Sequence, residues 1–247
     1  MVNSRMRQRP ACCSSIAIVA VLAVGAAYVQ SADQSVRVVH VSSRDELQRV
    51  ISKAGPGQRI EIAPGRYAGG LTCRALEGSE SRPIVIAAAD ANHPPVFEGG
   101  DSGIHLSNIA HVEIRNLTFT GARGNGVNID DGGSSATPTH HLLLHGLRIT
   151  EVGPRGNCDG IKLSGVDDFR IEKCHVARWG SSGSAIDMVG CHRGQIEDCM
   201  FRHDQADAAN GVQTKGGSSQ ILVRGCRFHH TGARGVNIGG STGMAYF

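Results

Sequence analysis

The chain has 247 residues, of which 25 are basic and 22 are acidic, giving a formal net charge of +3. Three of the basic residues, Arg5, Arg7 and Arg9, lie in the first 32 residues, so the remaining 215 residues (247 − 32) carry 22 basic and 22 acidic side chains. A neutral chain gives no reason to expect nucleic-acid binding, which requires clustered cationic residues. With 4% aromatic residues, it also lacks the stacking platforms of a dedicated carbohydrate-binding module.

The N-terminal segment has the layout of a secretory signal peptide. The three arginines precede an apolar run over residues 16–29, and small residues follow. The run is too short to span a bilayer comfortably. We therefore expect residues 1–32 to be a cleaved signal peptide and residues 33–247 to be secreted, periplasmic or held at the cell surface. An uncleaved anchor is the alternative, and only then would the chain contact a membrane.

A short strand and a helix are predicted next. Residues 36–41 (VRVVHV) form the strand, and Ser43 and Glu46 have the spacing of a capping box. Leu47, Val50 and Ile51 would make one apolar face of a helix that ends at Gly55-Pro56-Gly57. Further strands are predicted at residues 59–63, 70–75, 83–89 and 95–99.

From residue 112 onward, one strand-like segment recurs five times. It reads VEIRNLTF from Val112, LLLHGLRI from Leu142, FRIEKCHV from Phe169, GQIEDCMF from Gly194 and ILVRGCRF from Ile221. Aligned, the segments form one column of Leu117, Leu147, Cys174, Cys199 and Cys226, and a second of Phe119, Ile149, Val176, Phe201 and Phe228. The columns recur every 25 to 30 residues, a period typical of stacked supersecondary units.

A second strand alternates with the first and starts at Gly103, Gly126, Gly160, Ala185, Gly211 and Gly235. Both strands alternate apolar and polar residues, so each has one buried and one solvated face. The connecting stretches are rich in glycine and have no helical periodicity. The prediction is an all-β fold, a parallel β-helix of about six to eight coils, with the helix after Ser43 capping the first coil.

The cysteines of the repeat are expected to lie in the interior. Cys174, Cys199 and Cys226 share an inward column, so we expect buried thiols that act as small hydrophobic side chains. Cys158 and Cys191 stand at corners and are the more plausible reactive or bridging pair.

The last residues, 235–247, follow a repeated strand without a polar terminal coil, so we expect a truncated form of a longer β-helix or capping by association.

Polar residues between the apolar positions of the second strand should face solvent. They form the column His105, Asn128, Lys162, Asp187, Gln213 and Asn237. The preceding position adds Asn125, Asp159, Ser184, Asn210 and Arg234, and the position two after the column adds Asp130, Ser164 and Lys215. A polar strip that repeats once per coil, roughly every 4.8 Å, suits an extended polysaccharide, although any solvated sheet face is polar.

The stretch DELQRVISKAGPGQRIEIAPGRYAGGLTC from Asp45, followed by RPIVIAAADANHPPVFEGG from Arg82, resembles the opening of the pectate-lyase-like right-handed parallel β-helix superfamily. Within it, the chain is most similar to the chondroitinase B and alginate lyase family. The resemblance implies an exported protein that acts on or binds uronic-acid-containing polysaccharide along one parallel sheet. It makes an anionic polysaccharide the expected partner.

Elimination from a uronide needs a base, a cation that stabilises the enolate and an acid for the leaving oxygen. We assign the catalytic positions to Lys162, Asp187 and Lys215, with the lysines as candidate bases. The substrate-binding residues are predicted to be His105, Asn128, Asp159, Asn210, Gln213, Arg234 and Asn237. The pair Asp130-Asp131 could hold Ca²⁺ through carboxylate oxygens.

The same residues are also compatible with other functions. An epimerase is a near variant of the lyase, and Asp159 with Asp187 could form the carboxylate pair of a hydrolase. The alternative to an enzyme is a non-catalytic surface protein that binds glycan or serves as a rigid spacer. We interpret His140-His141 and His229-His230 as solvated turns, because no paired-histidine metal motif is present. Trp179 could stack on a sugar or pack beneath its neighbouring loop.

Overall fold

The computed structural model describes residues 36–153, 155–204, 208–240 and 242. The predicted signal peptide, residues 1–32, lies outside the described residues. Within them, no helix is long and apolar enough to cross a membrane.

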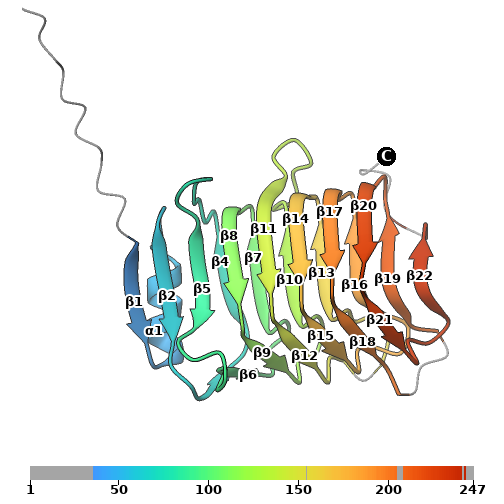
Figure 1. Ribbon diagram of the computed structural model, residues 1–247, viewed down its shortest axis with the longest axis horizontal. Helices are drawn as coiled ribbons and strands as arrows, with labels where there is room; N and C mark the ends of the chain where they lie inside the picture. The colour runs from blue at the N-terminus through green and yellow to red at the C-terminus, as the bar shows by residue number, and fades with distance from the viewer. Residues whose placement is uncertain (1–35, 154, 205–207, 241, 243–247) are drawn as a thin grey trace, which may run out of the picture. The chain divides into compact units, whose positions relative to one another are not determined.

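The described chain folds into three parallel sheets and one helix (Figure 1). Sheet A contains β1 (Arg37–Val41), β2 (Gln58–Ile62), β5 (Ile84–Ala88), β8 (Ala110–Arg115), β11 (Thr139–His145), β14 (Val166–Glu172), β17 (His192–Glu197) and β20 (Ser219–Arg224). Sheet B contains β3 (Arg66–Ala68), β6 (Val96–Glu98), β9 (Thr118–Thr120), β12 (Arg148–Thr150), β15 (His175–Ala177), β18 (Met200–Arg202) and β21 (Arg227–His229). Sheet C contains β4 (Leu71–Arg74), β7 (Ile104–Ser107), β10 (Val127–Asp130), β13 (Ile161–Ser164), β16 (Ser184–Val189), β19 (Asn210–Lys215) and β22 (Arg234–Ile238).

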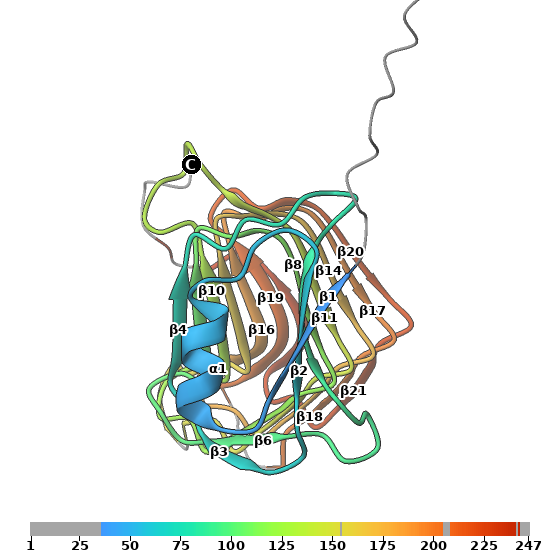
Figure 2. The ribbon, with the colours of Figure 1, turned by 90° about the vertical axis from the view of Figure 1, so that its left-hand side faces the viewer.

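Each coil runs through sheet A, then sheet B, then sheet C, and like strands stack on one another in order along the axis (Figure 2). This is the predicted parallel β-helix, with three strands per coil. The repeated segment that begins at Val112 is therefore two strands, β8 and β9, separated by a corner at Asn116. Sequence alternation alone did not reveal that break.

The corner between sheets A and B is built from residues with left-handed backbone conformation. Asn116, Lys173 and Asp198 have φ of 52° to 55°, and the equivalent Gly146 and Gly225 have φ of 63° and 65°. Asparagine, aspartate and glycine tolerate this conformation better than other residues, so the sequence permits the same sharp bend in successive coils. The bend turns the chain from the long strand of sheet A into the short strand of sheet B.

The interior is a set of side-chain columns that agree with the sequence alignment. In sheet B, the registered column is Tyr67, Phe97, Phe119, Ile149, Val176, Phe201 and Phe228. Phe97 is fully buried and stacks between Tyr67 and Phe119, with ring centroids 5.3 and 5.4 Å away. The column adds buried apolar area with each coil and is part of the continuous hydrophobic core, which is how a repeat fold gains stability.

The cysteines from Cys73 onward are all free thiols. Cys174 and Cys199 are buried and Cys226 is half-buried, so the prediction of inward thiols is confirmed. The suggested pairing of Cys158 with Cys191 is wrong. Cys191 is completely buried, and this burial raises the pKa of its thiol to about 12, so it behaves as a small core side chain.

The helix α1 (Arg44–Ile51) lies over the open end of the first coil, against β2 and β4 (Figure 2). Its Leu47 and Ile51 are buried, and the Ser43 hydroxyl accepts a hydrogen bond from the Glu46 amide at 3.2 Å. The Glu46 carboxylate accepts from the amide of Ser42 rather than that of Ser43, so only half of the predicted capping box forms as expected. The helix is an N-terminal cap, as predicted.

Candidate functional site

The outward face of sheet C carries the predicted polar column in consecutive register. His105 pairs with Asn128, Asn128 with Lys162, Lys162 with Asp187, Asp187 with Gln213, and Gln213 with Asn237. The intervening positions, such as Ile129, Leu163 and Met188, are fully buried. The geometry thus provides one polar position per coil along six adjacent strands, as the alternation predicted.

Three of these coils form a compact cluster of two lysines and two aspartates. Asp187 Oδ2 contacts Lys162 Nζ directly and lies 3.2 Å from Lys215 Nζ. Lys162 Nζ is also 3.8 Å from Asp159 Oδ2. The lysine side chains are 20% and 11% exposed, whereas those of Asp159 and Asp187 are 3% and 1% exposed. The lysine side chains are therefore closer to solvent than the two carboxylates, which lie beneath them.

Asp159 is positioned by two backbone contacts. Its Oδ1 accepts a hydrogen bond from the Ser184 amide at 2.7 Å, and its own amide donates to Asn125 Oδ1 at 2.9 Å. Burial, and next the negative charge of Asp187, raise the pKa of Asp159 to about 6, although Lys162 opposes the rise. The group can therefore exchange a proton near neutral pH, which an exposed aspartate does not do.

This pKa predicts a pH dependence of stability. Because the pKa of Asp159 is higher in the folded chain than in the unfolded one, its contribution is fully present below pH 4 and is lost as pH rises through about 6. The rise from 3.8 to about 6 corresponds to roughly 3 kcal/mol. We expect Asp159→Asn, which keeps an acceptor for Ser184, to gain stability relative to the wild type by up to that amount between pH 4 and pH 7.

The measurement is chemical denaturation of both proteins at a series of pH values. Asp101→Asn serves as the control, because Asp101 is 90% exposed and pairs only with Arg123 at the surface. A difference between Asp159→Asn and the wild type that stays constant with pH would contradict the assignment.

A second polar group lies toward the N-terminal end of the same face. His105 Nε2 is 2.6 Å from Asp130 Oδ2 and 3.2 Å from the Ser107 hydroxyl. Burial opposes ionisation of Asp130, but hydrogen bonds from His105, Ser107 and the Gly132 amide outweigh it and lower the pKa of this carboxyl. His105 and Ser107 also line a hollow of about 500 Å³ with Ser52, Thr72, Cys73 and Arg74. Ser107 was not among the predicted residues, although it stands two after His105 on the same strand.

The carboxylates of Asp130 and Asp131 offer few free oxygens as ligands for a calcium ion. Both Asp130 oxygens already accept hydrogen bonds, from His105 and the Gly132 amide, and Asp131 Oδ1 accepts from the Gly133 amide at 2.8 Å. Of the four carboxylate oxygens of this pair, Asp131 Oδ2 is the one that is buried without a hydrogen-bond partner among the described residues. Ca²⁺ takes six to eight oxygens, so this donor set fits the ion poorly. Calcium at this pair stays a prediction.

The other predicted binding residues lie along the same sheet. Gln213 accepts from the Ser184 hydroxyl at 3.2 Å and donates to the Gly239 carbonyl at 3.2 Å. Asn210 is buried beside Ser184, whereas its register partner Arg234 is exposed on β22. Asn128 and Asn237 are outward members of the column. Their roles toward a ligand stay predictions.

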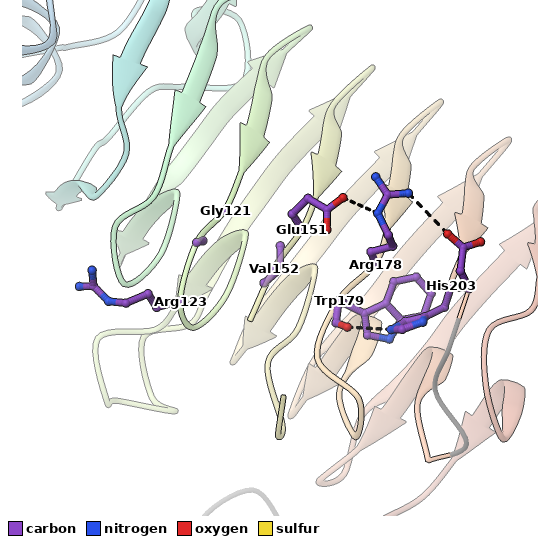
Figure 3. A pocket seen from close by; sticks show the side chains of 9 residues that line it. Gly121, Arg123, Glu151, Val152, Arg178, Trp179 and His203 are labelled. Atoms are coloured by element: carbon purple, nitrogen blue, oxygen red, sulfur yellow. Dashed lines mark hydrogen bonds and ion pairs between the residues drawn. The ribbon is translucent and has the colours of Figure 1, made fainter. Parts of the chain in front are cut away.

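A larger hollow, of about 620 Å³, lies at the corner that leads from sheet B to sheet C (Figure 3). Arg178 contacts the Glu151 carboxylate and lies 3.7 Å from Asp204 Oδ2. Trp179 is 2% exposed and packs edge-on against His203, which binds the Trp179 carbonyl oxygen at 2.7 Å. The indole is therefore packed into the corner, which is the second of the two roles considered for it.

Comparisons with known proteins agree with this architecture. The sequence model of the family described as "Right handed beta helix region" matches residues 96–245, more than half of the chain. The chain belongs to the right-handed β-helix family. No match was found among curated protein sequences.

Solved structures with the same fold include three polysaccharide lyases. An alginate lyase from Paenibacillus sp. str. FPU-7 is 22% identical with a TM-score of 0.68, over 82% of this chain and 74% of that one. A mannuronic acid specific polysaccharide family 6 lyase from human gut microbiota is 16% identical, with a TM-score of 0.62 over 82% and 53% of the two chains. Pectate lyase Pel9A is 17% identical, with a TM-score of 0.55 over 78% and 62%. At these identities, the similarity establishes the shared pectate-lyase-like fold.

Proposed function

We propose that this right-handed β-helix is an exported enzyme that cleaves a uronic-acid-containing polysaccharide by β-elimination on the outward face of sheet C. The observation that carries the proposal is the convergence of Lys162 and Lys215 on the single carboxylate of Asp187. Two ammonium groups side by side on a polar strip suit a substrate that brings a carboxylate on each sugar. The three lyases that share the fold support this choice of substrate class.

The cluster can supply the positive charge that elimination requires. Removal of the proton beside the substrate carboxylate creates an enolate with additional negative charge. The Lys215 ammonium group, which Asp187 holds in place at 3.2 Å, stabilises this charge without reorganising during the reaction. Asp187 is buried beneath the two lysines, so it acts as a positioning residue rather than touching the substrate.

The same cluster can move the protons. Lys162 is the proposed base, and it acts as the free amine after its ammonium group has lost a proton to solvent. Asp159, whose carboxylate lies 3.8 Å from the Lys162 Nζ, is neutral below its pKa of about 6 and then does not hold the ammonium form. The free amine then accepts the proton from the carbon beside the carboxylate. As a carbon–carbon double bond forms, the bond from the sugar to the leaving oxygen breaks. Lys215 is placed to donate a proton to that oxygen.

The test is a product assay on a panel of anionic polysaccharides, including alginate, pectate and chondroitin. We expect an unsaturated product that absorbs in the near ultraviolet to accumulate with one class of uronan. New reducing ends without this absorbance would indicate hydrolysis instead and would contradict the proposed elimination.

A non-catalytic glycan-binding protein is the second candidate. It is favoured by the contact of both lysines with Asp187, since each ammonium already has an anionic partner. Binding of a uronan without any cleavage, measured by calorimetry, would support this candidate over the enzyme.

A further inference from the structure

Three histidines from two adjacent coils gather on sheet A, away from the strip of sheet C. His111 lies on β8, and His140 and His141 lie on β11. One nitrogen from each ring lies within 4.8 Å of the nitrogens of the other two. His111 and His140 are half-buried and His141 is exposed, so solvent can reach the cluster from one side.

The register of sheet A brings these rings together. His140 pairs with Ala110 and Leu142 pairs with Val112, which places His141 next to His111, one coil apart. Both residues have left-handed backbone, with φ of 55° and 52°, at the same step of their strands. Their rings stack with centroids 4.4 Å apart, and the His140 ring meets each of them edge-on.

We propose that His111, His140 and His141 form a binding site for a divalent transition-metal ion that prefers imidazole nitrogen, with Zn²⁺ the first candidate. Three histidines and one open position are a recurrent zinc ligand set. Ligands 2.0 to 2.1 Å from a tetrahedral ion lie about 3.3 Å from one another. The nitrogens here lie within 4.8 Å of one another, so the rings must rotate about their side-chain bonds to reach that spacing.

His140 and His141 share a hydrogen bond that binding of a metal ion would replace. Their Nδ1 atoms are 2.8 Å apart, so one nitrogen donates a proton to the lone pair of the other. If the metal binds both Nδ1 atoms, that proton leaves Nδ1 and the donor ring carries its N–H on Nε2 instead, so both rings stay neutral and both Nδ1 lone pairs become available as ligands.

Carboxylates stand one coil further along the same sheet. Asp167 is the register partner of His140, and its Oδ1 is buried without a hydrogen-bond partner among the described residues. Its other oxygen accepts from Arg193 at 3.0 Å. Metal-bound histidines usually donate their second N–H to a carboxylate, and Asp167 is placed to accept it. This site does not rest on the proposed activity, which uses side chains of sheet C.

The test is calorimetric titration of tag-free protein with ZnCl₂. We expect one ion per chain and an affinity at least about tenfold lower in His111→Asn, His140→Ala and His141→Asn, in line with the effects of altering zinc sites. Asparagine is chosen at residues 111 and 141 because it tolerates left-handed backbone, so the variants should keep the fold.

The matched control is the double variant His229→Ala, His230→Asn. It removes another adjacent pair whose second member also has left-handed backbone, with φ of 49°. It should bind Zn²⁺ as the wild type does. The proposal is overturned if the wild type takes up no stoichiometric Zn²⁺, or if the control loses as much affinity as the three cluster variants. Co²⁺ offers a second readout, since four-coordinate binding would produce visible absorption that the His141→Asn variant lacks.

Discussion

Replacing Lys162 with alanine is expected to lower the rate of uronan elimination about 10²- to 10⁴-fold, the range that a positioned proton-transfer group contributes. The variant removes the amine proposed to accept the substrate proton. Asp187 keeps Lys215 as a partner at 3.2 Å, so the cluster retains one ion pair and the fold should persist. The initial rate of near-ultraviolet absorbance, with substrate binding measured separately, provides the comparison.

Lys215→Ala should also slow turnover, but with a larger loss of binding, because it removes the ammonium group proposed to meet the substrate carboxylate. Lys53→Ala is the matched control, since Lys53 is an exposed lysine just after α1. It should leave the rate unchanged. If Lys162→Ala and Lys215→Ala both fold and turn over substrate within about twofold of the wild type, the site on sheet C is wrongly assigned.

Replacing Phe97 with alanine is expected to cost about 3–5 kcal/mol in the free energy of unfolding. The ring is fully buried and contacts an aromatic ring on either side, so its removal opens a cavity and ends two stacking contacts. Neighbouring coils cannot close the gap, because hydrogen bonds to both adjacent strands hold β6 in place. Denaturation in urea, followed by circular dichroism, measures the loss.

Phe228→Ala is the control for this effect. Phe228 occupies the same position in β21, but it is only partly buried, and within the described part of the chain its one aromatic ring neighbour is Phe201 at 5.2 Å. Its replacement should cost clearly less. Equal losses for the two variants would mean that stacking within the column does not determine stability.

Much of the coil geometry could be predicted from the sequence because two independent periods coincide in it. Alternation within each strand tells inward from outward residues, and the repeat between segments tells which residues are stacked. Together they placed Lys162 beside Asp187 and Phe119 beside Ile149 correctly. The third strand of each coil was harder to find, because a strand such as β3 has only three residues and shows no clear alternation.

The histidine cluster was missed for a related reason. Within its own segment, the pair His140-His141 lacks the spacing of a metal motif and indicates a solvated turn, whereas the structure places it on β11. Starting the aligned segments one residue earlier would put His111 and His141 at matching positions, because each directly precedes the first inward residue of its segment, Val112 or Leu142. The matching positions of His111 and His141 can be found in the sequence, but only by comparing two different coils.

The sequence by itself determined the winding of the chain, the inward columns and the outward face of sheet C, because these depend on repeated hydrophobic patterns that each coil can satisfy only in one register. The tertiary structure alone decided which outward side chains touch and how deeply they are buried. Asp187 between two lysines, and the pKa of Asp159 near 6, depend on distances and on exclusion of water. Such quantities arise from several coils together, and no single segment of sequence contains them.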